Sequence, residues 1–565
     1  MDDIRQQLAA PGGQFELKDI EVRGVPMRVF ANGPQTMRDV WQAGRAHGDV
    51  TYVVYEDERF TYAEIDAQVR SLADALVKQY GVQPGDRVAV SMRNYPEWIV
   101  SYWAIVSIGA AVVGMNAWWT SAEMAYGLDD SQPKVLIADR ERVERFAEIV
   151  DETRAERALP LIAVRCDGEL PEDGVHWASV VDPATAPDEL PAIDIDPDDD
   201  ATIFYTSGTT GFPKGAQLTH RGSVSNIMNI GFMGTASAML TAAMNPDTEP
   251  APPVRAISLA PTPLFHVTAN NCGLQPLTLA GGTIVLMYKW DATRAIELIE
   301  RERATSMGGV PMMAREVLSH PDFDKRDTSS LSSLGGGGAQ VQPDLVHKID
   351  EVERLVPRTG YGLTETHGIV TAVAAKLFTD KPESAGPIVP TLDAKLVDDD
   401  GNDLASGPEV VGQLCVRGPV VIKGYLNKPE ATADAIRDGW FNTGDIARID
   451  DEGFVYIIDR AKDMVLRGGE NVYCAEVESA IFEHPAVAET IVFGVPDERL
   501  GEEVGACVVL AQGQQLTADD LQTFLVKRIA KFKVPQHIWF RDEVLPRNAS
   551  GKFLKRQVKA ELLAD

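Results

Sequence analysis

The chain is poor in cysteine and in positive charge. Its five cysteines are dispersed and form no CxxC pair, which argues against a disulfide framework or a cysteine zinc site and fits a reducing cytosol. The 565 residues include 53 Lys and Arg against 84 Asp and Glu, which gives a formal net charge of −31. Because contact with nucleic acid or an anionic membrane requires a basic surface, this shortage argues against both partners.

The chain also lacks the signs of export and of a membrane span. Its first residues do not show a basic segment followed by an apolar one, so we expect no signal peptide and a cytoplasmic protein. Residues 98–119 are 22 residues without a charge, long enough to cross a bilayer. Because Gly109 interrupts this run and a β-branched stretch follows, we predict a helix and then a short buried strand.

The chain is too long for one hydrophobic core, which predicts at least two domains. Apolar strand-like runs alternate with amphipathic helical runs, as in α/β layering. Strands are expected at residues 87–91, 135–138, 161–164, 201–205 and 283–286, and a helix at residues 292–303. Short strands and glycine turns between residues 385 and 458 predict a small antiparallel β region.

The pattern changes after residue 459. Strands near 490–495 and 504–510 and a helix near 517–530 predict a compact α+β fold. We therefore predict an α/β protein with a large N-terminal domain of residues 1–459, made of two doubly wound α/β subdomains and a β-barrel-like region, and a small mobile C-terminal domain of residues 460–565. The C-terminal part has 14 basic and 16 acidic residues, so it is better suited than the rest to meet a polyanionic ligand.

One short segment predicts nucleotide chemistry. Residues 205–215 read Tyr-Thr-Ser-Gly-Thr-Thr-Gly-Phe-Pro-Lys-Gly, directly after a predicted strand. Glycines let backbone amides approach a phosphate, hydroxyls donate hydrogen bonds, and the lysine adds positive charge. The segment is not a Walker A loop, because Lys214 follows Pro213 and precedes Gly215. It predicts a polyphosphate site, and a solvated surface loop is the alternative.

Four further motifs follow in order. They are Tyr-Gly-Leu-Thr-Glu-Thr at 361–366, Thr-Gly-Asp at 443–445, Asp-Arg-Ala-Lys-Asp-Met-Val-Leu-Arg-Gly-Gly-Glu-Asn at 459–471, and Pro-Arg-Asn-Ala-Ser-Gly-Lys at 546–552. With the first segment, and over residues 35–560, the chain resembles the adenylate-forming acyl-CoA synthetases, relatives of the luciferases and of peptide-synthetase adenylation domains. The resemblance implies two steps. A carboxylate attacks the α-phosphate of ATP and releases pyrophosphate, and a thiol, usually that of CoA, then displaces AMP.

The resemblance implies ATP-binding roles for several groups of residues. The β- and γ-phosphates would be held by Thr206, Ser207, Gly208, Thr209, Thr210, Gly211 and Lys214. Adenine would pack on the segment of Tyr361 and Gly362, in a pocket also lined by Gly337, Gly338 and Ala339. Glu365 would bind Mg²⁺, which prefers oxygen ligands, and Thr364 would lie near the α-phosphate.

The ribose and the nucleoside would be held by later motifs. Asp445 would accept hydrogen bonds from both ribose hydroxyls, since a carboxylate has several acceptor sites. Arg460 would make a second ribose or phosphate contact, and Asn471 would lie near AMP. The alternative for Asp445 and Arg460 is an ion pair without a ligand.

The resemblance places the catalytic charge in a mobile domain. Lys552 would bridge the attacking carboxylate and the α-phosphate, and a lysine in a solvated tail is the alternative. Lys462 would be the hinge, whose rotation removes Lys552 and brings Gly468, Gly469 and Glu470 to CoA.

The acyl group is the least determined part. His266 would lie beside the acyl carboxylate and gate the thiol tunnel, and a core histidine is the alternative. The expected acyl pocket is small and apolar, with no evident cation, at positions Val267, Thr268, Asn271, Cys272, Gly308, Gly309, Val310 and Gly335. It suits a hydrophobic monocarboxylic acid: first a medium- or long-chain fatty acid, second an aryl or polycyclic acid.

Several rival functions stay open. The acyl group could be loaded on a separate carrier protein instead of CoA, and a luciferase-type oxygenase uses the same scaffold. From another class, the chain could be a nucleotide-binding regulator without activity, although retention of Lys214, Glu365, Asp445 and Lys552 argues against this. The sequence does not reveal the oligomeric state, and a homodimer stays open.

Overall fold

The computed structural model describes residues 2–151, 158–206, 213–244, 246, 254–405, 407–468, 470–548 and 551–564. The chain divides into two units. Unit 1 comprises residues 1–382, 386–393 and 417–441, and unit 2 comprises residues 383–385, 394–416 and 442–565. The predicted domain boundary at residue 459 lies inside unit 2, near the end of a strand, and stays a prediction.

The first sheet of unit 1 has seven strands in the order β11-β10-β6-β5-β7-β8-β9. Only the β10–β11 pair is antiparallel. The strands are β5 (Arg87–Ser91), β6 (Ala111–Gly114), β7 (Val135–Asp139), β8 (Leu161–Val164), β9 (Gly174–His176), β10 (Asp200–Thr206) and β11 (Lys214–Thr219). Strands β6, β7 and β8 are buried along their length, as expected of parallel strands covered on both faces. The strands predicted in this region are confirmed.

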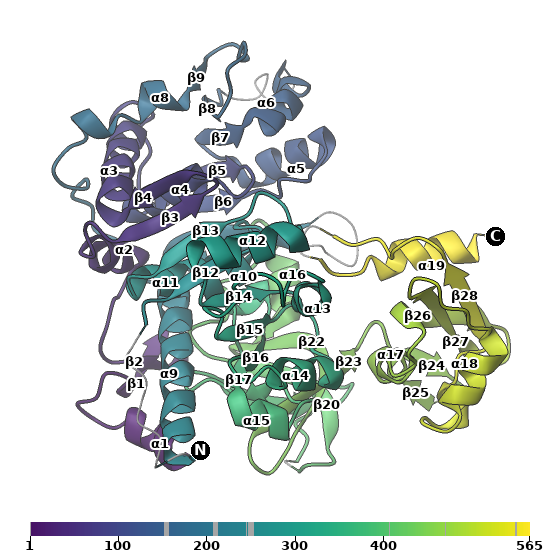
Figure 1. Cartoon of the computed structure of the whole chain (residues 1–565). Helices are drawn as coiled ribbons and strands as arrows, with labels where there is room; N and C mark the ends of the chain where they lie inside the picture. The colour runs from purple at the N-terminus through teal and green to yellow at the C-terminus, as the bar shows by residue number, and fades with distance from the viewer. Residues whose placement is uncertain are drawn as a thin grey trace. The chain divides into compact units, whose positions relative to one another are not determined.

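The second sheet of unit 1 has eight strands in the order β17-β16-β15-β14-β12-β13-β3-β4, and only its edge strands are antiparallel to their neighbours. The strands are β3 (Thr51–Tyr55), β4 (Glu58–Thr61), β12 (Ile257–Ala260), β13 (Thr283–Leu286), β14 (Ser306–Gly309), β15 (Ser333–Gly336), β16 (Val356–Tyr361) and β17 (Thr371–Ala374). Helices α12 (Ala292–Glu302), α13 (Pro311–Ser319) and α14 (Pro343–Asp350) pack on it (Figure 1). The predicted doubly wound α/β fold is confirmed.

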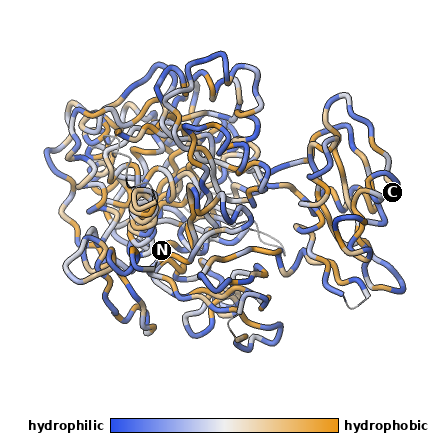
Figure 2. Tube along the Cα trace, turned by 60° about the horizontal axis from the view of Figure 1, so that its bottom comes forward, coloured by the Kyte–Doolittle hydropathy of each residue, from blue (hydrophilic) through white to orange (hydrophobic). Residues whose placement is uncertain are grey.

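Helix α4 (Pro96–Ser107) packs between the two sheets. It contacts β3 of the second sheet and β5 and β6 of the first. All its side chains are buried except that of Glu97, which is half-buried. A helix that is apolar on every face needs such surroundings, and in this chain protein supplies them. The prediction of a helix and a buried strand at residues 98–119 is confirmed. Figure 2 shows hydrophobic stretches of the chain in the interior and hydrophilic stretches in the outer loops.

Helix α9 (His220–Met244) is long and apolar enough to cross a membrane by length and composition. Its first half is buried and includes polar side chains, among them those of Asn226 and Asn229. The last residues are exposed, so that 33% of its most apolar window is buried. Because the core helix of a soluble protein has the same length and composition, α9 is weak evidence for a span.

Unit 2 contains the predicted antiparallel β region and a separate C-terminal sheet. In the β region β23 (Phe454–Arg460) pairs antiparallel with β22 (Trp440–Ile449), and β20 (Val411–Arg417) and β19 (Asp393–Val397) follow. The C-terminal sheet has the order β25-β24-β27-β26, with β28 beside β27. Its strands are β24 (Val465–Arg467), β25 (Glu470–Val472), β26 (Val487–Asp497), β27 (Gly501–Leu510) and β28 (His537–Arg541).

Three helices accompany the C-terminal sheet: α17 (Cys474–Phe482), α18 (Ala518–Leu525) and α19 (Lys555–Leu563). Buried aliphatic side chains of α17 and α18 join those of the sheet in one core. Helix α18 is shorter than the predicted helix at residues 517–530. The backbone turns after Leu525, where the Ile529 amide donates to the Leu525 carbonyl and the Ile529 side chain packs on the core.

A buried chain of hydrogen bonds connects α4 to the second sheet. The indole N–H of Trp103 donates to the Tyr52 hydroxyl at 2.9 Å, and this hydroxyl lies 2.5 Å from Oγ1 of Thr278. Thr278 in α11 (Gln275–Leu279) donates in turn to the Leu274 carbonyl at 2.7 Å. Tyr52 therefore donates to Thr278, and all three side chains are fully buried.

We predict that Tyr52→Phe lowers the free energy of unfolding by about 1–3 kcal/mol, because the indole N–H of Trp103 then lacks its acceptor in a buried site. Tyr80→Phe is the matched control, since the Tyr80 hydroxyl makes no hydrogen bond to the described part of the chain. Denaturant unfolding of both variants measures the effect. Equal stability of the two variants would contradict it.

Candidate active site

The predicted phosphate segment connects the two antiparallel strands β10 and β11. Thr206 ends β10 and is in register with Lys214, which begins β11. The Thr206 hydroxyl donates to the Lys214 carbonyl at 3.4 Å. The predicted phosphate ligands between these strands lie outside the described residues: Ser207, Gly208, Thr209, Thr210 and Gly211. The described part therefore places both ends of the segment at one edge of the first sheet.

Lys214 and Glu365 meet at the same aromatic side chain. The hydroxyl of Tyr425 donates to Oε1 of Glu365 at 2.9 Å, and Nζ of Lys214 lies 4.5 Å from the centre of the Tyr425 ring. Burial and the Glu365 charge raise the pKa of Tyr425, so its hydroxyl stays protonated as the donor. Tyr425 thus aligns a carboxylate and an ammonium group from two predicted motifs, within one unit.

A buried histidine holds the turn that carries Glu365. His367 follows the 3₁₀ turn of residues 364–366, and its Nε2 accepts from the backbone amide of Thr219 at the end of β11 (2.9 Å). Its Nδ1 lies 2.6 Å from the Val420 carbonyl and therefore carries the proton. Because burial lowers the pKa of His367 to about 4, the ring is neutral at pH 7 and both bonds persist. The histidine ties the Glu365 turn to the strand that leaves the phosphate segment.

The predicted adenine residues lie at the ends of β15 and β16. Tyr361 ends β16, and Gly362 follows it. Gly337, Gly338 and Ala339 follow β15, and Gly338 has a φ of +81° that favours glycine. Because β15 and β16 are parallel neighbours, both groups lie at the same edge of the sheet. Thr364 and Glu365 come next in the chain, in the 3₁₀ turn.

The predicted acyl residues lie on a helical segment and on two strands. His266 precedes α10 (Val267–Ala269), which contains Thr268, and its ring centre lies 4.8 Å from that of Phe265. Asn271 and Cys272 belong to the π-helical turn η2 (Asn270–Leu274), a rare geometry that is frequent at functional sites. Burial raises the pKa of the Cys272 thiol to about 12, so it is no nucleophile at pH 7.

Glycines of the strands complete the predicted acyl set. Gly308 and Gly309 end β14, and Gly335 lies in β15. Val310 follows β14 and is buried. One expectation about these positions is wrong: a cation does lie beside them, because the Arg358 guanidinium reaches over Gly308.

The predicted ribose residues form an ion pair in unit 2. Asp445 in β22 is in register with Arg460 in β23, and Nε of Arg460 lies 2.5 Å from Oδ1 of Asp445. The Asp445 side chain is buried, whereas that of Arg460 is exposed. Lys462 lies in the turn after β23, where desolvation and then the Arg460 charge lower its pKa. An ion pair without a ligand was the alternative to the ribose-binding role of Asp445 and Arg460. The observed pair is compatible with both, because the Arg460 side chain is exposed and could also contact a ribose.

The remaining predicted residues also belong to unit 2. Gly468 has a φ of +60° and its amide donates to the Leu500 carbonyl, while Gly469 lies outside the described residues. Glu470 and Asn471 lie in β25. The backbone N–H of Lys552 donates to the Asn548 side chain at 2.9 Å. The predicted catalytic lysine is therefore held by its backbone.

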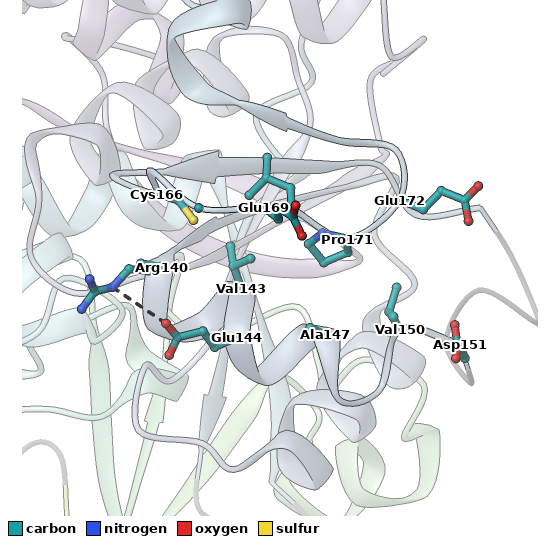
Figure 3. Close-up of a pocket in the computed structure, with 12 residues that line it drawn as sticks. Arg140, Val143, Glu144, Ala147, Val150, Asp151, Cys166, Glu169, Pro171 and Glu172 are labelled. Carbon is teal, nitrogen blue, oxygen red and sulfur yellow. Dashed lines mark ion pairs between the residues drawn. The ribbon is translucent and has the colours of Figure 1, made fainter.

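A cavity of about 700 Å³ lies elsewhere in unit 1, beside α6 (Arg140–Ala147) and the segment after β8. Figure 3 shows Arg140 paired with Glu144 at its edge, with Cys166 and further acidic side chains around it. None of the predicted site residues lines it. An acidic lining is unsuited to a nucleotide, so we assign it no role in the site.

The residues fit a magnesium ion held mainly by phosphate oxygens. Among the described residues no group of three or more His, Cys, Asp or Glu side chains could hold a metal by itself. Glu365 receives a hydrogen bond on one carboxylate oxygen, and a carboxylate has further acceptor sites. Because Mg²⁺ keeps waters and uses substrate phosphates, one such carboxylate is sufficient.

Two family models match the chain. The model of the AMP-binding enzyme matches residues 40–426, and that of the AMP-binding enzyme C-terminal domain matches residues 476–552. The chain belongs to the AMP-binding enzyme family. It is an AMP-forming acyl-CoA synthetase, as the motifs predicted, with ATP and CoA as substrates.

Known proteins similar to this synthetase differ in the acids they are named for. A feruloyl-CoA synthase from Amycolatopsis sp is 37% identical over 92% of this chain and 98% of that protein. A long-chain-fatty-acid–CoA ligase from Bacillus subtilis is 34% identical over 91% of this chain and 92% of that one. The solved o-succinylbenzoate CoA synthetase from B. subtilis, in complex with its acyl-adenylate intermediate, aligns with a TM-score of 0.74 and 28% identity over 92% of this chain and 97% of that chain.

Three residues of the synthetase were missed in the sequence. Tyr425 lies outside the five motifs, and only the fold brings it to Glu365 and Lys214. His367 directly follows the motif of residues 361–366, so its position in the sequence could have indicated that it lies close to Glu365. Arg358 lies three residues before Tyr361, where nothing in a single sequence separates it from a surface arginine.

We predict that the synthetase loses stability in mild acid because of two buried histidines. Burial lowers the pKa of His220 and of His367 from 6.5 to about 4, and each accepts a hydrogen bond from a backbone amide. Below pH 6.5 these two histidines bind protons in the unfolded chain but stay neutral in the folded chain, so unfolding becomes more favourable as pH falls. The loss reaches roughly 3 kcal/mol for each histidine by pH 4.

The variant His367→Gln tests the contribution of His367 to the loss of stability in acid. Glutamine keeps a donor and an acceptor but does not titrate in this range, so its thermal unfolding midpoint should fall less steeply between pH 7 and pH 4.5. Subtracting the pH profile of the variant from that of the wild-type protein removes the contribution of the carboxylates, because both proteins contain the same ones. Parallel pH profiles would contradict the assignment.

Proposed function

We propose that this acyl-CoA synthetase activates a hydrophobic carboxylic acid, with a medium- or long-chain fatty acid as first choice. The observation that carries the proposal is the glycine-rich surface of β14 and β15, where Gly308 and Gly335 lack side chains beside the predicted adenylate end of the strands. The long-chain ligase among the relatives supports the fatty acid. An aryl or polycyclic acid is the second candidate, and the feruloyl-CoA synthase supports it.

In the first step we assign charge stabilisation to three side chains. Lys214, at the end of the phosphate segment, would attract the leaving pyrophosphate, and Glu365 with phosphate oxygens would hold Mg²⁺. Lys552 would stabilise the charge that develops as a carboxylate oxygen attacks the α-phosphorus. The Tyr425 hydroxyl orients Glu365 before the substrates bind.

In the second step the CoA sulfur attacks the acyl carbonyl carbon and AMP leaves. We propose that residues 460–565 move as a domain about Lys462 between the steps, which would exchange Lys552 for Gly468, Gly469 and Glu470. His266 would lie beside the acyl carbonyl and control access of the thiol. We place the enzyme in the cytoplasm, and a homodimer is an open alternative.

The decisive experiment is carboxylate-dependent exchange of pyrophosphate into ATP, with a panel of fatty, aryl and polycyclic acids and with Mg²⁺ present. A medium- or long-chain fatty acid should give the highest exchange rate and an acyl-CoA product. Exchange without transfer to CoA, but with transfer to a purified carrier protein, would favour the carrier-loading alternative. Absence of exchange with every acid would refute the proposed activity.

We predict that Lys552→Ala slows adenylation by about 10²–10³-fold, because it removes a preorganised positive charge from the transition state. Thioester formation from supplied acyl-adenylate should be largely retained. The control Lys531→Ala removes an exposed lysine of the same unit and should leave both half-reactions unchanged. An equal loss of both half-reactions in Lys552→Ala would rule out the assigned role.

A further inference from the structure

An arginine extends over the glycine surface of the second sheet. Arg358 in β16 is in register with Gly335 in β15, and Gly335 is in register with Gly308 in β14. Residues in register on neighbouring strands share a face of the sheet. Because the two glycines have no side chains, the Arg358 side chain extends across them, and its Nη2 lies 4.0 Å from where a Cβ of Gly308 would be.

The face of Arg358 is the one opposite to helix α13. A Cβ at Gly309 would lie 2.8 Å from Sδ of Met313, so Gly309 points toward α13. Successive residues of a strand point to opposite faces. Gly308, and with it Arg358, therefore points away from α13. Two residues further along β16 the same face carries another glycine, Gly360, so no side chain of β16 intervenes on the way to Tyr361.

The guanidinium of Arg358 has no partner in the described part of the chain. Its side chain makes no hydrogen bond, ion pair or ring contact there, and part of it stays open to solvent. Desolvation lowers the pKa of Arg358, and no nearby carboxylate offsets it. Other arginines of this acidic chain behave differently, since Arg294 and Arg326 each pair with two carboxylates. Its donors thus remain available to a ligand.

The distance along β16 between Arg358 and Tyr361 indicates how long the bound acid must be. Tyr361 follows Arg358 by three positions, which corresponds to about 10 Å between their backbones in an extended strand. Tyr361 marks the end at which the adenylate is proposed to form. An acid activated there and lying along the glycine surface would bring its far end to the guanidinium.

We propose that the acid carries an oxygen acceptor at the end remote from the activated carboxyl group, and that Arg358 binds this oxygen. The inference rests on the proposed acid–CoA ligase function and narrows its substrate class. The shared chemistry is a hydrogen-bond-accepting oxygen, ionised as a second carboxylate or neutral as a phenol, which the five donors of a guanidinium can meet. Arg358 is then a specificity-determining residue, because the reacting atoms lie at the other end of the acid.

Two matched pairs of acids test the proposal: octanoic with octanedioic acid, and cinnamic with 4-hydroxycinnamic acid. The wild-type enzyme should prefer the oxygenated member of at least one pair, in kcat/KM for acyl-CoA formation, by about 10- to 100-fold. Arg358→Gln should abolish this preference and leave kcat/KM for the plain acid unchanged. The control Arg315→Gln should keep the preference, because Arg315 lies on α13 and pairs with Asp344 of α14.

The outcomes separate the two proposals. A wild-type enzyme that prefers plain acids, or an Arg358→Gln variant that loses activity equally with both members of a pair, would overturn the role of Arg358. Loss of preference in the diacid pair alone identifies an anionic group, and loss in the phenol pair identifies a neutral one. If no acid forms a thioester, calorimetric titration of the same free acids still decides, because equal affinity of wild type and Arg358→Gln would overturn the inference by itself.

Discussion

The close approach of three parallel strands is the constraint on which the proposed site depends. A Cβ at Gly336 would lie 1.7 Å from the carbonyl oxygen of Gly309, and one at Gly335 would lie 2.1 Å from that of Arg358. No other residue fits there without displacing backbone. The same absence of side chains leaves one face of β14 and β15 bare beside the ends of the strands, where ligands bind in open α/β sheets.

A second group of contacts orients the charged residues. Tyr425 holds Glu365 through a hydroxyl and lies against the ammonium group of Lys214. His367 attaches the Glu365 turn to β11 through a neutral ring. These contacts are made before any substrate is present, which is what preorganised electrostatic stabilisation requires. In unit 2 the Asp445–Arg460 pair similarly joins β22 to β23 just before Lys462.

Much of this arrangement could be predicted from local sequence. The apolar runs of β5, β7, β8 and β13 identify buried parallel strands because their pattern is continuous. The motif at residues 361–366 predicted roles for Glu365 and Tyr361 without any contact information, and these roles stay predictions. The predicted helix at residues 517–530 was too long, since α18 ends at Leu525 and the chain turns there, with Ile529 packed on the core of the C-terminal sheet. The joining of the early hairpin β3–β4 to the second sheet is a non-local pairing that no local pattern encodes.

The sequence by itself determined the family, the ATP chemistry and the elements that carry the motifs, because these depend on residue type and short spacing. Only the tertiary structure decided that Tyr425 meets Glu365, that His367 is neutral, and that Arg358 lies without a partner over two glycines. Each of these depends on strand register or burial, which bring together residues up to 148 positions apart. The physical reason is that hydrogen bonding and desolvation act over a few ångströms in space, whatever the separation along the chain.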